Sequence, residues 1–262
     1  MHQPRLMPDR FLLIAQPDSY RLAPYIQAAN NLGLEVVIAS RGEHSLITEV
    51  NEGLHINLDN HDQALDSILQ TAAVKPFAGV LGSDDSTVTL AAHVAQRLGL
   101  PHNDPVAAQA SRRKDIARAN LLLAGCPVPS HCLININDPI VPQIKGIPFP
   151  CVLKPLHLSA SRGVIRADNV DEFMAACDRI RPIIKLQGDD FERNNILIES
   201  YIDGVEVAYE GYLHAGTLTT LAIFDKPDPL AGPYFEDTIY VTPSRLEPQV
   251  QEKIRQRVQQ AC

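Results

Sequence analysis

The chain of 262 residues has no excess of positive charge and no long apolar run, and both absences exclude broad classes of protein. Its formal net charge is −8 at pH 7, and its densest basic cluster, residues 112–114, is followed at once by Asp115. Nucleic-acid backbones are held by basic surfaces, so we expect no nucleic acid as an obligatory partner. The N-terminal apolar run at 11–15 is far too short to span a membrane, so we expect no membrane partner either.

Two sequence signatures are also missing. The five cysteines include no C-x-x-C pair, and their odd number gives no disulfide framework, which favours a reducing, cytoplasmic location. Residues 16–19 read Gln-Pro-Asp-Ser, where a dinucleotide-binding fold would carry G-x-G-x-x-G after its first strand. The missing fingerprint disfavours a nicotinamide-dependent oxidoreductase.

Apolar patterning in the first hundred residues predicts strands that alternate with helices. We expect strands at 11–15, 34–39, 54–58 and 77–81, and helices at 19–31 (capped by Ser19), 62–73 and 87–98. Such alternation is typical of parallel βαβ units, so residues 1–105 are predicted to form a small doubly wound α/β domain.

After Pro105 the pattern changes to an α+β style. We expect helices at 106–124, 171–180 and 245–262, a polar loop at 187–195, and strands near 130–136, 149–154, 196–202, 206–213 and 217–224. The last two strands are predicted to form a hairpin that turns at residues 214–216.

The segment 151–164 is the most informative part of the chain. An apolar run ends in Lys154, a loop of small residues follows at 159–163, and an apolar pattern resumes at Val164, which together predict a β-hairpin with a lysine beside its tip. Backbone N–H groups of such a loop can approach phosphate oxygens closely, and a lysine adds a point charge for the same oxygens. An ordinary hairpin with a surface lysine fits this segment alone equally well.

Two further features of the sequence belong to the same pattern as this hairpin. Lys114 lies on a predicted helix before a Gly-Cys-Pro-Val-Pro turn, and Glu199 and Glu206 flank a turn at Gly204. The order of these motifs resembles the ATP-grasp superfamily of carboxylate–amine and carboxylate–thiol ligases, and the resemblance covers essentially the whole chain. Within it, residues 159–164 and 224–236 look most like the L-amino-acid ligases and carnosine-synthase-like enzymes, often labelled phosphoribosylglycinamide-synthetase-like.

The resemblance implies roles for the residues that match the family's phosphate site. Lys114 and Lys154 would hold the phosphates of ATP. Ser159, Ser161 and Gly163 would form the loop that folds over the β- and γ-phosphates. Lys114, beside two arginines, fits a solvated helix face as well.

The resemblance also implies a hinge that binds the nucleoside. Glu199 would open the hinge strand, the backbone of residues 200–202 would face the adenine edge with Tyr201 and Ile202 as its wall, and Glu206 would accept hydrogen bonds from the ribose hydroxyls. The two glutamates fit solvated sheet edges, and Tyr201 and Ile202 fit core positions, as alternatives.

Lys226 and Arg162 are the candidate catalytic residues. A cation that reaches a transferred phosphoryl group stabilises its developing charge, and Lys226 stands beside an aspartate and two prolines in the family-like segment. Arg162 lies in the small-residue loop and fits either a loop charge or a phosphate ligand.

The implied fold is α/β: a pre-ATP-grasp (Rossmann-like) domain at 1–105, then a partial α+β ATP-grasp domain at 106–262. The implied activity is ATP-dependent: a carboxylate becomes an acylphosphate, an amine attacks it, and an amide or dipeptide forms. The expected substrates are a small-molecule carboxylate and a small-molecule amine, both amino acids, and the expected cofactors are ATP and Mg²⁺. Assembly as a homodimer is left open.

One departure from the family concerns its metal site. The family's Mg²⁺ ligands, a Glu and a Glu-x-Asn strand pair farther downstream, have no match after Ser244. We therefore expect the ATP-grasp domain to be incomplete at its C-terminus, and we identify no metal ligand in the chain. The alternative function is a non-catalytic nucleotide-binding module, or a degenerate member of the family that lacks the Mg²⁺ site.

Overall fold

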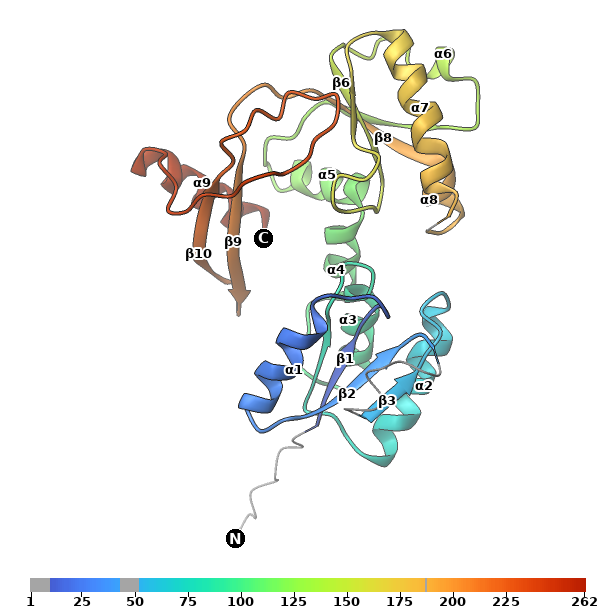
Figure 1. Ribbon diagram of the computed structural model, residues 1–262, viewed down its shortest axis with the longest axis vertical. Coiled ribbons are helices and arrows are strands. Elements are labelled where there is room, and N and C mark those ends of the chain that lie inside the picture. Colours follow the sequence, from blue (N-terminus) through green and yellow to red (C-terminus); the bar gives the residue numbers. More distant parts are fainter. Residues whose placement is uncertain (1–9, 43–51, 187) are drawn as a thin grey trace. The chain divides into compact units, whose positions relative to one another are not determined.

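The computed structural model describes residues 10–42, 52–186 and 188–262 (Figure 1). The chain divides into two compact units, Met1–Arg112 and Arg113–Cys262. Helix α4 (Pro105–Arg112) lies in the first unit, and the domain limits of 1–105 and 106–262 stay a prediction. None of the described helices is long and apolar enough to cross a membrane.

The first unit is a parallel sheet with helices on both faces. Its elements are β1 (Arg10–Ile14), α1 (Leu22–Asn31), β2 (Glu35–Ser40), β3 (Glu52–His55), α2 (His61–Val74), β4 (Gly79–Gly82), α3 (Val88–Arg97) and α4. The strand order is β3-β2-β1-β4, and every pairing is parallel. Because side chains alternate along a strand, Leu13 and Ile38 pack with α1, whereas Leu12 and Val37 pack with α2 and α3. The predicted doubly wound α/β fold is confirmed.

Helix α1 shows how a distant contact changes a predicted boundary. The sequence predicts a helix that begins with Ser19 as its cap, but α1 begins at Leu22. The Ser19 hydroxyl instead donates a 2.8 Å hydrogen bond to Asp84, in the turn after β4. Serine is suited to capping a helix, but the Ser19 hydroxyl is used by Asp84, a partner far along the chain.

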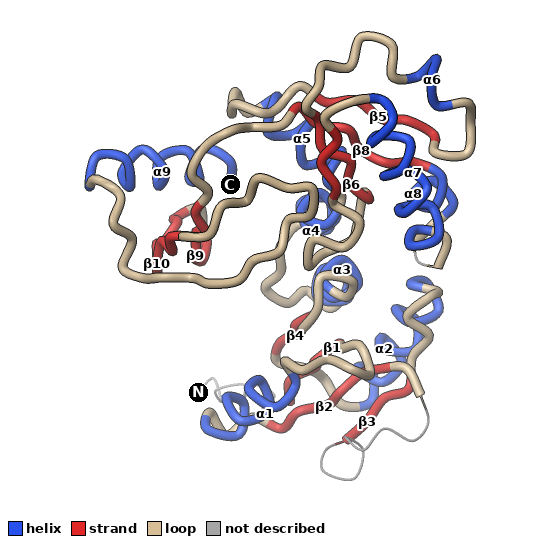
Figure 2. Tube along the Cα trace, turned by 45° about the horizontal axis from the view of Figure 1, so that its top comes forward, coloured by secondary structure: helices blue, strands red, loops and turns tan. Residues whose placement is uncertain are grey.

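The second unit contains an antiparallel sheet and a separate hairpin (Figure 2). Its elements are α5 (Lys114–Leu123), β5 (His131–Asn135), α6 (Ile140–Gln143), β6 (Cys151–Pro155), β7 (Ile165–Ala167), α7 (Val170–Ile184), α8 (Asp190–Asn194), β8 (Asn195–Ser200), β9 (Val207–His214), β10 (Thr217–Asp225) and α9 (Pro248–Ala261). The four-stranded sheet has the order β5-β8-β6-β7, and β9 pairs with β10 alone. Both predicted hairpins, β6–β7 and β9–β10, are confirmed.

The core of the second unit lies between the four-stranded sheet and α7. Leu153 of β6 and Ile198 of β8 pack against Phe173 and Ile180 of α7, and all four are buried. Side chains of neighbouring positions on a strand point to opposite faces, so Lys154 and Glu199 point away from α7. Figures 1 and 2 show α5 on the other side of β6 and β8 from α7.

Three predictions in this unit are corrected by the structure. The helix expected at 106–124 is divided into α4 and α5, because Arg113 between them is extended (φ −98°, ψ 107°). The polar loop expected at 187–195 contains α8, whose capping box joins Asp189 and Glu192; residue 187 lies outside the described residues. Strand β8 ends at Ser200, whereas the sequence predicts residue 202.

Candidate functional site

One buried carboxylate holds two cations on the face of the sheet opposite α7. In the β6–β8 register Lys154 faces Leu197 and Glu199 faces Val152, so Lys154 and Glu199 are diagonal neighbours. Lys154 Nζ donates to Glu199 Oε2 at 2.5 Å, and Arg118 Nε of α5 donates to Glu199 Oε1 at 2.6 Å. The Glu199 side chain is only 3% exposed. Three elements therefore meet at this carboxylate.

The two cations keep Glu199 ionised. Burial alone raises the pKa of its carboxyl group, but the hydrogen bond from Arg118 and the charge and hydrogen bond of Lys154 outweigh burial, so the pKa lies below its ordinary value. A buried charge without a partner is strongly destabilising. Lys154 and Arg118 therefore stabilise this unit by pairing with the buried charge of Glu199.

Helix α5 places a third cation, Lys114, beside the segment that follows β6. Lys114 and Arg118 are four residues apart and so share one face of α5. Lys114 Nζ donates to Leu158 O at 2.5 Å, and its N–H donates to Leu156 O at 2.9 Å. These bonds fasten the start of α5 to the segment that leaves β6. Lys114 is a predicted site residue and Arg118 is not, although its spacing of four from Lys114 is a signal in the sequence that could have found it.

The predicted small-residue loop between β6 and β7 forms a left-handed turn. The φ angles are +54° at Ala160, +53° at Ser161 and +72° at Gly163. A Cβ atom at Gly163 would lie 2.8 Å from Cγ of Pro155, so the glycine is required both by its φ and by this close approach.

Some N–H groups of this loop close the turn, and others point to no protein acceptor. Arg162 N–H donates to Ser159 O (3.3 Å), and Val164 N–H donates to Ser161 O (3.0 Å). The N–H groups of Ser161 and Gly163 donate no hydrogen bond to any residue that the structure describes. Main-chain N–H groups in left-handed turns form concavities that bind anions. The loop is thus shaped to receive an anion.

The hinge after β8 has fewer available donors than the sequence suggests. Ser200 N–H donates to Ser130 O (2.8 Å), and Tyr201 N–H donates to Pro150 O (3.1 Å). Two of the three N–H groups expected to face an adenine are therefore used within the protein. The N–H of Ile202 has no acceptor within the described residues, and Ile202 is 69% exposed. Of the three N–H groups, this one is left without a partner among the described residues.

Lys226 and Glu206, which were predicted to bind different parts of ATP, form an ion pair with each other. Lys226 Nζ lies 2.5 Å from Glu206 Oε1 and 2.8 Å from Asp237 Oδ1, and 5.5 Å from the centre of the Tyr240 ring. Burial lowers the pKa of the Lys226 ammonium, but hydrogen bonds to Asp237 and Glu206 raise it more, so the pKa lies above its ordinary value. Arg162, the other candidate catalytic residue, is exposed in the small-residue loop.

The residues that the structure describes contain no group of three or more His, Cys, Asp or Glu side chains that could hold a metal ion. Glu206 and Asp237 are carboxylates of the kind that Mg²⁺ prefers, but a lysine ammonium lies between them. The group around Lys154 is rich in cations, and its chemistry fits phosphate oxygens instead.

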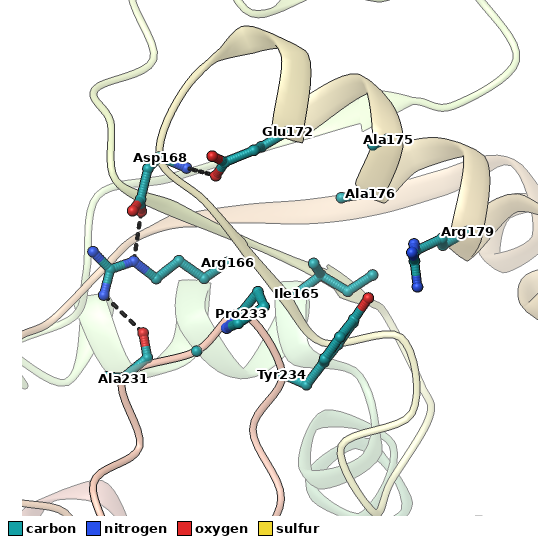
Figure 3. Close-up of a pocket in the computed structure, with 11 residues that line it drawn as sticks. Ile165, Arg166, Asp168, Glu172, Ala175, Ala176, Arg179, Ala231, Pro233 and Tyr234 are labelled. Carbon is teal, nitrogen blue, oxygen red and sulfur yellow. Dashed lines mark hydrogen bonds and ion pairs between the residues drawn. The ribbon is translucent and has the colours of Figure 1, made fainter.

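A cavity of about 440 Å³ lies at the edge strand β7 (Figure 3). None of the predicted site residues lines it. Arg166 donates from Nε to Asp168 (2.6 Å) and from an Nη to Ala231 O (2.7 Å), and its guanidinium lies 4.2 Å from the centre of the Tyr201 ring. Figure 3 shows Arg166 between Asp168 and Ala231. Its donors fasten the segment around residue 231 to β7, so this cavity is not the expected phosphate site.

Comparison with known protein families assigns the class of protein. An ATP-grasp N-terminal domain matches residues 26–102, and an ATP-grasp domain matches residues 147–262. These two matches cover most of the chain, and the chain belongs to the ATP-grasp superfamily.

Individual relatives agree with this assignment. Alanine–anticapsin ligase of Bacillus subtilis is 24% identical over 222 residues, which are 78% of this chain and 46% of that protein. The L-amino acid ligase of Bacillus licheniformis superposes with a TM-score of 0.79 at 23% identity, covering 96% of this chain and 59% of the ligase. An N5-carboxyaminoimidazole ribonucleotide synthetase, solved as an ADP complex, gives a TM-score of 0.72 at 13% identity over 98% of this chain and 63% of the synthetase. The chain thus spans about half the length of the first of these relatives.

Proposed function

We propose that this chain is the ATP-binding part of a carboxylate–amine ligase whose product is an amide or a dipeptide. The observation that carries the proposal is the grouping of Lys154, Arg118 and Glu199 beside the left-handed loop at 159–163. Cations from α5 and β6 beside a loop with available N–H groups suit a polyphosphate. The names of the relatives, an alanine–anticapsin ligase and an L-amino acid ligase, favour amino acids as the carboxylate and the amine.

In this proposal the hairpin holds the phosphates. Lys114 and Lys154 bind phosphate oxygens, and Ser159, Ser161 and Gly163 supply the loop that covers the β- and γ-phosphates. Arg162, exposed in the same loop, adds a cation at the transferred phosphoryl group. Cations placed where charge develops lower the barrier to phosphoryl transfer.

The hinge and the adjoining hairpin hold the nucleoside in this proposal. Ile202 N–H donates to the adenine edge, Tyr201 and Glu199 support the hinge, and Glu206 accepts from the ribose hydroxyls. Two of the three donors of Lys226 are used by its carboxylate partners, Glu206 and Asp237, which leaves one donor for a phosphoryl group.

The chemistry follows from the poor electrophilicity of a carboxylate. ATP transfers its γ-phosphoryl group to a carboxylate oxygen, which releases ADP and gives an acylphosphate. The amine nitrogen then attacks the acyl carbon, the C–O bond to phosphate breaks, and the ammonium proton is lost. No step is routed through Mg²⁺, for which the described residues offer no group of three or more ligating side chains.

Calorimetric titration with ATP, with and without Mg²⁺, tests the binding part of the proposal. Saturable binding to the 262-residue chain is expected in both titrations, and no binding in either would contradict the proposal. Adenosine and GTP serve as control ligands, because the hinge should prefer adenine and the hairpin should need phosphates.

Phosphate release tests whether these residues suffice for catalysis. With ATP, Mg²⁺ and pairs of amino acids, we expect the 262-residue chain to bind ATP without amino-acid-dependent turnover, since two anionic reactants must meet without a metal that the described residues can hold. Robust turnover would show that the metal has ligands not identified in the sequence, of which Glu236 and Asp237 are the first to test.

A further inference from the structure

We propose that Arg118 is a third cation of the phosphate site, and that Glu199 is the positioning residue that aims it. The inference rests on the proposed function, because it concerns the same anion site. It departs from the sequence analysis in two ways: Arg118 joins the site, and the Glu199 side chain serves the cations rather than the nucleotide.

The first observation is the way in which Arg118 is held. Only its Nε is used, in the 2.6 Å bond to Glu199. Its two terminal nitrogens make no hydrogen bond or ion pair within the described residues. A guanidinium has five N–H donors in a rigid fork, and four of them belong to these terminal nitrogens. The side chain is 26% exposed, so a ligand can reach it from solvent.

The second observation is the geometry of Lys154. Its Nζ carries three donors, and one of them is directed at Glu199. The side chain is 21% exposed, whereas Glu199 is almost completely buried. The buried Glu199 therefore accepts one hydrogen bond from each cation. The other N–H donors of Arg118 and Lys154 remain available to a ligand.

The third observation is the charge balance. Arg118 and Lys154 carry two positive charges, and Glu199 supplies one negative charge. Lys114, one turn before Arg118 on α5, adds a further cation, and its Nζ donates to Leu158 O. The cluster is therefore positive overall and fits a polyphosphate better than a neutral ligand.

A carboxylate can lie in a site for anions because it orients the cations that bind the anion. Free lysine and arginine side chains have many accessible rotamers, and ordering them costs entropy that a ligand must otherwise overcome. A buried carboxylate that binds both side chains fixes them before the ligand arrives. Glu199 cannot easily bind the nucleotide itself, since both of its oxygens already accept hydrogen bonds from cations.

The test measures binding of inorganic tripolyphosphate, ATP and adenosine to the wild-type chain, to Arg118→Gln, Arg118→Lys and Glu199→Gln, and to the double variant Arg118→Gln/Glu199→Gln. Arg255→Gln is the matched control, because Arg255 is a partly exposed arginine of α9 that pairs with a carboxylate, Glu252. Thermal unfolding checks that each variant is folded. Arg118→Lys keeps the charge and tests the site even if Arg118→Gln does not fold.

We expect Arg118→Gln to weaken ATP and tripolyphosphate by about tenfold or more, with adenosine and the control variant unchanged. Arg118→Lys should recover part of the loss. The loss caused by Arg118→Gln should be smaller in a Glu199→Gln background, because an unheld guanidinium contributes less to binding. A purely structural role would not produce this coupling.

Each contrary outcome has a distinct meaning. Unchanged ATP and tripolyphosphate affinity in Arg118→Gln overturns the inference and leaves the proposed function intact. Equal losses for adenosine and ATP also overturn it, since they would place Arg118 and Glu199 at the nucleoside. Wild-type binding of tripolyphosphate without ATP would contradict the proposed function while the anion site stands, and binding of neither ligand would overturn both.

Discussion

The second unit contains two lysine clusters with opposite charge balance. At Lys154 one buried carboxylate is shared by two cations, whereas at Lys226 one cation is shared by two carboxylates, Glu206 and Asp237. The first cluster has a net positive charge and unused hydrogen-bond donors, whereas the second has a net negative charge. The sequence suggests phosphate roles for both lysines, but the structure favours that role only for Lys154.

The two clusters also differ in burial. The Glu199 carboxylate is 3% exposed, whereas Glu206 is 55% and Asp237 is 35% exposed. Water can replace a lost partner at the exposed carboxylates but not at the buried one. The same kind of ion pair should therefore contribute very differently to stability in the two places.

The largest expected effect is on stability. Replacing both Arg118 and Lys154 with methionine leaves Glu199 buried without a cation, and we expect a loss of about 3–5 kcal/mol in the free energy of unfolding. Lys226→Met leaves two solvated carboxylates and should cost about 1 kcal/mol or less. Urea denaturation followed by circular dichroism measures both. Equal costs for the two changes would remove the distinction between the clusters.

A second difference should appear as a dependence on pH. The folded-state pKa of Glu199 lies below its ordinary value, so its contribution to stability is present above the unfolded pKa and is lost as pH falls through the lowered folded pKa. The gap in unfolding free energy between wild type and Glu199→Gln should therefore narrow as the pH is taken from 7 towards 3. Asp237→Asn is the exposed counterpart, because the pKa of Asp237 is also lowered, and its gap should narrow less. A gap for Glu199→Gln that does not change with pH would contradict the assignment of an ionised Glu199.

The smallest expected effect concerns Glu206 and the ribose. Glu206→Gln should weaken ATP by about 0.5–1.5 kcal/mol, the usual contribution of one hydrogen bond, and should weaken 2′,3′-dideoxy-ATP less. Calorimetry with the two nucleotides measures the difference. Equal losses would mean that Glu206 does not contact the ribose and serves only as a partner of Lys226.

Local patterns in the sequence predicted much of the fold. Short apolar runs located most strands of both units, and the small residues at 159–163 located the turn that the φ angles confirm. Helix α8 was missed although its signal was present, since Asp189 and Glu192 have the spacing of a capping box.

Other features depend on contacts that a sequence does not display. The break between α4 and α5 follows from Arg113, whose buried guanidinium binds Asp115 at 2.8 and 2.9 Å. From the sequence, a solvated helix face was only an alternative for the basic cluster at 112–114. The pairing of Arg118 with Glu199 joins residues 81 positions apart, and only the register of β6 and β8 brings Lys154 to the same carboxylate.

The central claim is that the cluster at Lys154, and not the cluster at Lys226, binds phosphate. The direct measurement is a calorimetric titration of ATP into the wild-type chain, Lys154→Ala and Lys226→Ala under the same conditions. We predict that Lys154→Ala weakens ATP binding by about 1.5–3 kcal/mol, the range for a hydrogen bond to a charged group, while Lys226→Ala changes it by less than about 0.5 kcal/mol. A loss confined to Lys226→Ala, with Lys154→Ala binding ATP as tightly as wild type, would contradict the account.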